Sequence, residues 1–322
     1  MQRLVSLLIP DRFIVILLAM VGVAAVLPAR GTALDWLGAV STICIVTLFF
    51  VHGARLSRSA VIGGFTRLRL HLVIVGFTFL IFPLLGLALT TVAAPLIEPA
   101  FVPGILFLCA LPTTVASSIA MVSMAKGNVA ASVIAAALSS MLGVVLTPLM
   151  FAALLSTAGA PIDLSGIGKV VLILALPFAI GHLCRPLAGA WIEAHPGVGR
   201  SLDRLTILLA IYVALSAAVG GGLLAGLGLD RFLWLLAAML ALLVLVIGTA
   251  MLIAQLFRFD YGDGAALLFA AMQKSIISGT PMARILFPGA EAGLIIVPLL
   301  VYYVPMMTVS AIMAARMGSV RE

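Results

Sequence analysis

Lys274 is the residue of this chain whose position most directly indicates chemistry. It lies in the stretch AALLFAAMQKSIISGTPMA, which is too apolar for anything but a buried or membrane helix. An ammonium group at the midplane of a bilayer costs at least about 2.5–3.5 kcal/mol on insertion scales. With about ten residues on either side, it would lie roughly 15 Å from each interface, too deep for comfortable snorkelling. We therefore expect Lys274 to contact a solute or ion, or to exchange a proton during transport, rather than to be a structural lysine.

Two clusters of hydroxyl residues mark breaks in apolar segments. The first is Leu111–Ser118 (LPTTVASS) and the second is Lys274–Pro281 (KSIISGTP). A helix break frees backbone groups, which lipid tolerates only where protein, water or solute satisfies them. Half-helix N-termini favour anions and C-terminal ends favour cations. A single hydroxyl could equally well bond to its own helix, but the two clusters together favour a binding site lined by Thr113, Thr114, Ser117, Ser118, Gln273, Lys274, Ser275 and Ser278.

The composition places these residues in an integral membrane protein. Of 322 residues, 64% are hydrophobic and 9% are charged, against roughly 25% charged in a soluble domain. At about 20 residues per span, the chain allows about ten transmembrane helices and little else. The apolar segments are 13–27, 36–53, 70–92, 102–124, 129–155, 167–184, 205–227, 232–257, 265–287 and 292–317.

Ten helices divide into two sets of five, and because five is odd the second set enters the membrane from the opposite side. The predicted fold is therefore all-α, a single transporter unit with inverted repeats at residues 1–160 and 161–322 and with discontinuous fourth and ninth helices. Most Lys and Arg residues fall on the side of both termini, which predicts that the termini are cytoplasmic. Spread over separate loops, these basic residues favour topology and anionic lipid headgroups over nucleic acid.

The acidic residues are informative by their positions. All eleven fall in loops, at helix ends or at the termini, so a cation at mid-membrane would have to be held by neutral oxygens. That disfavours sodium coupling and leaves proton coupling open. No cluster of Cys and His suggests a metal, and no cofactor is expected.

Two stretches resemble the bile acid:sodium symporter family. One is LPTTVASSIAMVSMAKGNVAASVIAAALSSMLGVVLTPLM, from Leu111 to Met150, where the family has a Pro-x-x-x-Ala-Ser break followed by Gly-Asn-Val-Ala and a Ser-rich helix. The other is Met272-Gln273, where the family typically reads Glu-x-Gly-Met-Gln-Asn. The stretches LFFVHGARLSR and KSIISGTPMARILFP are most similar to the bacterial branch related to the seventh member of the mammalian bile-acid carrier group.

The resemblance implies ten helices in a panel and a core domain, with substrate and two sodium ions at crossing discontinuous helices. It implies that Ser117, Ser118, Ser132 and Gln273 keep sodium-site positions. Other positions depart from the family: a threonine is Ala136, the ninth-helix acidic residue is Phe269, the asparagine is Lys274 and the third-helix glutamine is Thr78. Loss of a carboxylate with gain of an ammonium suggests that Lys274 replaces a bound sodium ion.

These features favour a secondary transporter of a small organic anion. One alternative is an intramembrane enzyme, because Gly262-Asp263-Gly264 faintly resembles intramembrane aspartyl proteases. The second aspartate of such a dyad is missing, and HExxH and GxSxG motifs are absent. The other alternative is a membrane sensor, which would not need two matched helix breaks. We therefore expect a protein that is not an enzyme.

Overall fold

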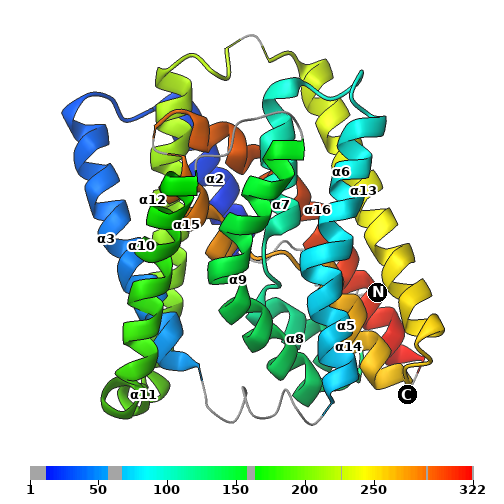
Figure 1. The fold of residues 1–322 in the computed structure, drawn as a ribbon. Helices are drawn as coiled ribbons and strands as arrows, with labels where there is room; N and C mark the ends of the chain where they lie inside the picture. Colours follow the sequence, from blue (N-terminus) through cyan, green and yellow to red (C-terminus); the bar gives the residue numbers. More distant parts are fainter. Residues whose placement is uncertain (1–11, 57–66, 158–163, 226, 288, 321–322) are drawn as a thin grey trace.

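The part of the protein that the structure describes is built from helices joined by turns and loops. The computed structural model describes residues 12–56, 67–157, 164–225, 227–287 and 289–320, and these ranges contain no β-strand. Figure 1 shows the helices in chain order. They are α2 (Arg12–Val26), α3 (Thr32–Arg55), α5 (Leu68–Gly76), the π-helix η1 (Phe77–Ile81), α6 (Phe82–Val92), the 3₁₀ turn η2 (Pro99–Phe101), α7 (Val102–Ala110), α8 (Val115–Met124), α9 (Val129–Thr157), α10 (Leu164–Leu183), α11 (Arg185–Ala194), α12 (Pro196–Gly220), α13 (Leu229–Leu256), α14 (Tyr261–Met272), α15 (Ile276–Leu286) and α16 (Glu291–Ser319).

Six helices in the described ranges are long and apolar enough to cross a membrane, and the bent pair α10 and α11, which turns by 88°, could be a seventh. The six are α3, the continuous run α5–η1–α6, α9, α12, α13 and α16. The predicted fourth and ninth segments are each split into two short helices, α7 with α8 and α14 with α15. The expected breaks are therefore present. The number of spans and the inverted repeats stay predictions.

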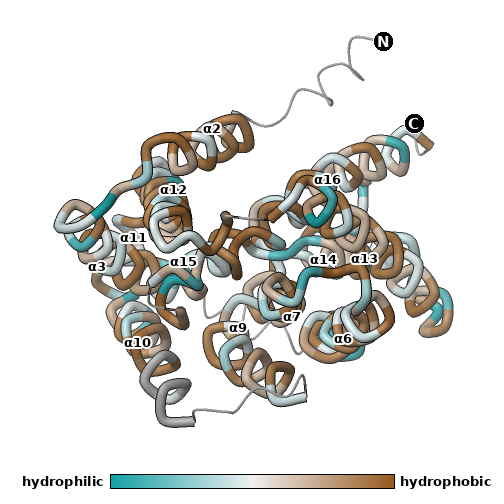
Figure 2. Tube along the Cα trace, turned by 90° about the horizontal axis from the view of Figure 1, so that it is seen from above, coloured by the Kyte–Doolittle hydropathy of each residue, from teal (hydrophilic) through white to brown (hydrophobic). Residues whose placement is uncertain are grey.

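The helices pack as two groups. We call α2, α3, α10, α11 and α12 the panel helices, because each packs against others of this set; the remaining helices are the core helices. Seen from above, the panel helices lie on one side of the molecule and most core helices on the other, with α15 close to the panel helices (Figure 2). They meet where α12 packs against α15 and α16 and where α10 packs against α9.

Close contact between α3 and α10 holds the panel helices together. A Cβ atom added to Gly53 would collide with the carbonyl oxygen of Phe178, and one added to Gly181 would collide with that of Phe50. Small residues allow helix backbones to approach in this way, and dispersion contacts then stabilise the pair.

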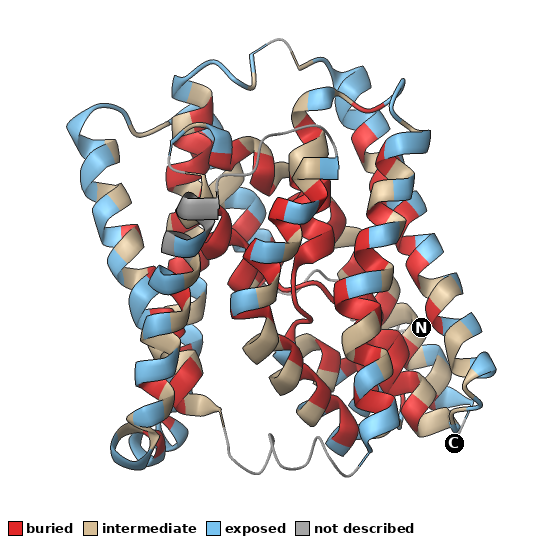
Figure 3. Cartoon of the chain, in the orientation of Figure 1, coloured by how far each residue is buried: buried red, intermediate tan, exposed pale blue. Residues whose placement is uncertain are grey.

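The burial pattern fits a lipid environment. Buried residues follow the inner faces of the helices and exposed residues follow the outer faces (Figure 3). Many exposed side chains are large and apolar, among them Leu172, Val244 and Leu252, which are 60%, 67% and 62% exposed. A soluble protein would rarely expose so many, whereas lipid tails match them.

Two elements differ from the sequence prediction. α12 begins at Pro196 rather than near residue 205, and α11 occupies a stretch that was expected to be a loop. Arg185, Arg200 and Arg204 are therefore on helices. The predicted boundary between the repeats, at residues 160 and 161, lies outside the described residues, as do Arg3 and Arg58.

Candidate functional site

The two helix breaks cross each other. Thr113 and Lys274 form an isolated antiparallel β-bridge. The N–H of Thr114 donates to the carbonyl of Gln273 over 3.2 Å, and the N–H of Ser275 donates to the carbonyl of Pro112 over 2.9 Å. Each break therefore provides hydrogen-bond partners for backbone N–H and C=O groups that the other break leaves unpaired. Non-helical backbone within a membrane requires such partners.

Side chains from the bridge also cap the opposite half-helix. Thr113 Oγ1 donates to the carbonyl of Ala270 in α14 over 2.8 Å. In return, Lys274 Nζ donates to the carbonyls of Leu111 over 2.8 Å and Cys109 over 3.1 Å, at the end of α7. The last carbonyls of a helix have no intrahelical donor, so these reciprocal caps stabilise both ends.

A third oxygen around the ammonium comes from η1. Lys274 Nζ donates to the carbonyl of Thr78 over 3.2 Å. In the π register, Phe82 donates to Phe77, so the donor for Thr78 would be residue 83. That residue is Pro83, which has no N–H. The π-helix and the proline together leave one carbonyl free at the position that the ammonium occupies.

Three neutral oxygens and an aromatic ring therefore surround the Lys274 ammonium. The Phe82 ring centroid lies 4.0 Å from Nζ, a cation–π geometry. The side chain is 1% exposed, and no described carboxylate lies within ion-pair distance of it. Carbonyls at half-helix C-terminal ends are the groups with which transporters coordinate monovalent cations. The arrangement is suited to holding one positive charge.

Two half-helices begin on the other side of the crossing. α8 starts after Thr114, whose side chain makes no capping bond, and Thr114 Oγ1 is buried without a partner. α15 starts after Ser275, whose Oγ accepts from the N–H of Ser278 over 3.1 Å. Helix N-termini carry a partial positive charge and attract anions.

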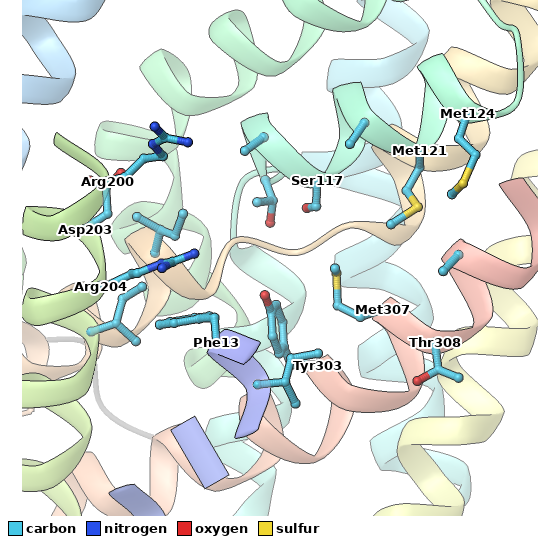
Figure 4. Close-up of a pocket in the computed structure, with 17 residues that line it drawn as sticks. Phe13, Ser117, Met121, Met124, Arg200, Asp203, Arg204, Tyr303, Met307 and Thr308 are labelled. Atoms are coloured by element: carbon cyan, nitrogen blue, oxygen red, sulfur yellow. The ribbon is translucent and has the colours of Figure 1, made fainter. Parts of the chain in front are cut away.

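Two cavities open beside these N-termini, between panel and core helices. Their volumes are about 520 and 420 Å³, and both are lined by Ala116, Ile277, Arg200 and Asp203. In the larger cavity, Ser117 and Met121 of α8 face Tyr303 and Met307 of α16, with the charged residues of α12 at one side (Figure 4). The lining is mostly apolar with a few polar groups, which is typical of a small-molecule site.

Comparison with known proteins assigns the fold to a transporter family. Residues 11–319 match the model of the SBF-like CPA transporter family. The chain belongs to this family. It is 41% identical to the uncharacterized protein PA2026 of Pseudomonas aeruginosa over 98% of this chain and 95% of that protein. It is 38% identical to the candidate symporter YfeH of Escherichia coli (95% and 92%) and 28% identical to the mouse sodium/bile acid cotransporter 7 (82% and 78%). As expected from the resemblance, the chain is a bile acid:sodium symporter-like, integral membrane transporter.

In this SBF-like protein, the predicted site residues fall into two sets. Thr114 and Ser117 line the larger cavity, and Ser275 and Ser278 line the smaller one. The linings of these two cavities do not include Thr113, Ser118, Ser132, Gln273 and Lys274, all of which are buried.

The buried set is joined to the cavities by hydrogen bonds. Ser117 Oγ donates to Gln273 Oε1 over 2.7 Å, while Gln273 Nε2 is buried without a partner. Ser118 Oγ and Ser132 Oγ lie 3.5 Å apart. Ser117 therefore connects the buried Gln273 to the wall of the larger cavity by a direct hydrogen bond.

The sequence analysis did not identify the charged side of the cavities. Arg200 and Asp203 line both, and Arg204 lines the larger one. Asp203 accepts from His52 Nε2 over 3.1 Å and from Arg55 Nη1 over 3.5 Å, which joins α12 to α3. Pro196 could have indicated them, because proline is favoured at the first position of a helix. A helix predicted to begin at Pro196 would have included Arg200, Asp203 and Arg204.

Asp263 would be a catalytic residue if the protein were an intramembrane aspartyl protease. In the structure its carboxylate is part of a hydrogen-bonded cluster. Its carboxylate accepts from Arg67 Nη1 over 2.6 Å and from Asn128 Nδ2 over 2.7 Å. The nearby Asp260 is used as the N-cap of α14, where its Oδ1 accepts from the N–H of Asp263 over 2.8 Å. These contacts join the start of α14 to α5 and to the turn between α8 and α9.

Proposed function

We propose that this protein moves a small organic anion across the membrane by alternating access, with the Lys274 ammonium in the place of a bound sodium ion. The observation that carries the proposal is the binding of Nζ by the carbonyls of Thr78, Cys109 and Leu111. By the resemblance to the bile acid:sodium symporter family, Thr78 stands at the position of the family's third-helix glutamine and Lys274 at that of its asparagine. The ammonium thus donates to carbonyl oxygens that could otherwise coordinate a cation.

Inverted repeats of five helices are supported by the reciprocity of the crossing. Thr114 and Ser275 are the N-caps of α8 and α15, and the residue before each, Thr113 or Lys274, caps the half-helix of the other break. Such an exchange is expected when two equivalent units face each other across a pseudo-two-fold axis.

An anionic substrate is supported by the cavity wall rather than by Lys274. The N-termini of α8 and α15 both border the cavities, and Arg200 lines both of them. The ammonium of Lys274 already donates to three carbonyls. It therefore contributes a positive charge at the crossing but does not contact the solute. Relatives include a protein named as a sodium/bile acid cotransporter, which fits an organic anion as cargo.

The cavities open toward the side that is rich in Lys and Arg. Arg55, Arg200 and Arg204 line them, and these residues belong to the face predicted to be cytoplasmic by the positive-inside rule. On this proposal the protein lies in a bacterial inner membrane, and the conformation with these cavities is the inward-facing one.

Replacement of sodium by Lys274 predicts coupling that does not require sodium. Transport would then be linked to a proton exchanged at Lys274 or would proceed without an ion. A ligand that binds only the folded state raises its stability by RT ln(1 + [L]/Kd). Sodium binding can therefore be measured without knowing the cargo.

The test compares the thermal stability of purified protein in NaCl and in choline chloride at equal ionic strength. Wild type should show no specific response to sodium, and Lys274→Asn should gain one. Lys126→Asn is the matched control, because Lys126 lies in the turn after α8 with a positive φ of 55° that asparagine tolerates. A specific sodium response of wild type, or the absence of a response in Lys274→Asn, would contradict the replacement.

A second measurement addresses the anion. We expect carboxylates and sulfonates with apolar bodies to stabilise the protein more than their neutral amides, and Arg200→Gln to weaken that effect about two- to fivefold, as for an exposed ion pair. The control is Arg231, which lies beside Glu98. Arg231→Gln should leave the stabilisation by anions unchanged. Equal stabilisation by neutral analogues would argue against an anionic cargo.

A further inference from the structure

Arg284 is a cation at the seam between panel and core helices. It lies in the last turn of α15, and its guanidinium faces α3, since a Cβ atom added to Gly38 would lie 3.4 Å from Nη2. Its Nε is buried without a hydrogen-bond partner. In the described part of the chain no carboxylate lies within ion-pair distance of it, although Asp35 is one turn from Gly38 on α3. A guanidinium has five donors, and a partly buried one without an acceptor is unusual.

Two further unpartnered groups follow the same helix faces. Thr280 lies one turn before Arg284 on α15, and Ser41 lies one turn after Gly38 on α3. Both are completely buried, and neither hydroxyl has a hydrogen-bond partner. In contrast, Thr42 donates to the carbonyl four residues earlier in α3, which is how a hydroxyl in a membrane helix is ordinarily satisfied.

This seam lies on the side of the crossing opposite the two cavities. The smaller cavity is lined by the start of α15, at Ser275 and Ser278, and by the end of α3, at His52 and Arg55. Arg284 and Gly38 are at the other ends of these helices. Buried polar groups without partners are costly, so water or a solute would stabilise this part of the seam if it opened.

We propose that Arg284 is the anion contact of the outward-facing state. Opening of the seam between α3 and α15 would place the guanidinium and Thr280 on the wall of a further cavity, separate from the two described above. There an anionic group, a carboxylate or sulfonate, binds before it passes to the N-termini of α8 and α15. This inference rests on the alternating-access function proposed above. It adds a site on the opposite face and assigns it a ligand class.

The test measures the charge preference at Gly38, where a cysteine side chain fits in ordinary contact with Arg284. Gly38→Cys is made in a chain whose three native cysteines are replaced by alanine. In right-side-out vesicles, it is labelled with an anionic methanethiosulfonate (sulfonatoethyl) and with a cationic one (trimethylammonioethyl). A unit charge about 6 Å away in water-like surroundings changes each rate roughly threefold and in opposite directions. The anionic-to-cationic rate ratio should therefore fall roughly tenfold when Arg284→Gln is added.

Arg231→Gln is the matched control and should leave the ratio unchanged. Failure of both reagents to label Gly38→Cys would refute the opening of the seam, and a ratio that Arg284→Gln does not change would refute the anion contact. The same labelling is repeated in nanodiscs with the Gly38→Cys protein that keeps Arg284. If this protein prefers the anionic reagent in phosphatidylcholine but not in phosphatidylglycerol, the group bound by Arg284 is a lipid phosphate. The proposal of a solute site is then wrong. The sodium and anion measurements on the cytoplasmic cavities do not depend on these results, so the two proposals can fail separately.

Discussion

Replacing Lys274 by methionine would separate the two opposing effects of its ammonium. Methionine keeps most of the side-chain volume but cannot donate a hydrogen bond. It would remove the charge and leave the carbonyls of Thr78, Cys109 and Leu111 without this donor. The first effect stabilises the folded protein and the second destabilises it.

The structure allows the balance to be worked out. Each hydrogen bond to a charged group contributes about 1.5–3 kcal/mol, and each buried group left without a partner costs about 1–3 kcal/mol. Burial of an ammonium costs several kcal/mol after relaxation, and methionine recovers this. Since three carbonyls lose a donor within a site that is 1% exposed, we expect a net loss of about 2–4 kcal/mol. At about 2 °C per kcal/mol for a large protein, the apparent Tm should fall by about 4–8 °C.

The assay is thermal unfolding of the purified protein in one detergent at a fixed pH. Thr113→Val is the matched variant, because it removes the reciprocal cap to the carbonyl of Ala270 without changing charge. It should cost about 1 kcal/mol, or about 2 °C. If Lys274→Met is as stable as wild type or more stable, burial of the ammonium outweighs its hydrogen bonds. In that case the ammonium does not stabilise the crossing, and the reasoning above is wrong.

Two further predictions concern helix packing and the cluster of Asp263, Arg67 and Asn128. Gly181→Leu should prevent the contact of α10 with the carbonyl of Phe50 and greatly lower the yield of monodisperse protein in size-exclusion chromatography. Gly22→Leu, at a site with no atom within 4 Å of the added Cβ, should leave the yield unchanged, and equal losses would refute the close-packing argument. Asp263→Asn should lower stability by about 1–2 kcal/mol by breaking the ion pair with Arg67, which is half exposed and so contributes less than a buried pair. If the Asp263→Asn protein were more stable than wild type, the Asp263 carboxylate would not stabilise the fold, and this prediction would be wrong.

The breaks could be predicted because they have a chemical signature. A membrane helix rarely contains Pro with several hydroxyl residues, and Leu111–Ser118 and Lys274–Pro281 both do. The structure ends α7 at Ala110 and α14 at Met272, at or just before these clusters. The position of Lys274 beside a break was predicted for the same reason.

The partners of Lys274 could not be predicted because they are main-chain oxygens. Every residue has a main-chain carbonyl, so the residue types do not show which carbonyls accept from Lys274. The free carbonyl of Thr78 also depends on a π-helix register that composition does not encode. The cavity wall was missed for another reason. Arg200 and Arg204 are charged residues before an apolar run, so hydropathy alone placed them in a loop, whereas α12 begins at Pro196.

The reciprocal caps also have a consequence for biogenesis. The carbonyls at the end of α7 are satisfied by Lys274, about 160 residues later in the chain, and ribosomes add about 5–20 residues per second. During synthesis the nascent first half would therefore wait roughly ten to thirty seconds in the bilayer with Cys109 and Leu111 uncapped. Exposed backbone in lipid is costly, so the early helices would have to be held by water, an insertase or the translocon until residue 274 emerges. A chain that stopped before this residue would be a natural substrate for membrane proteases.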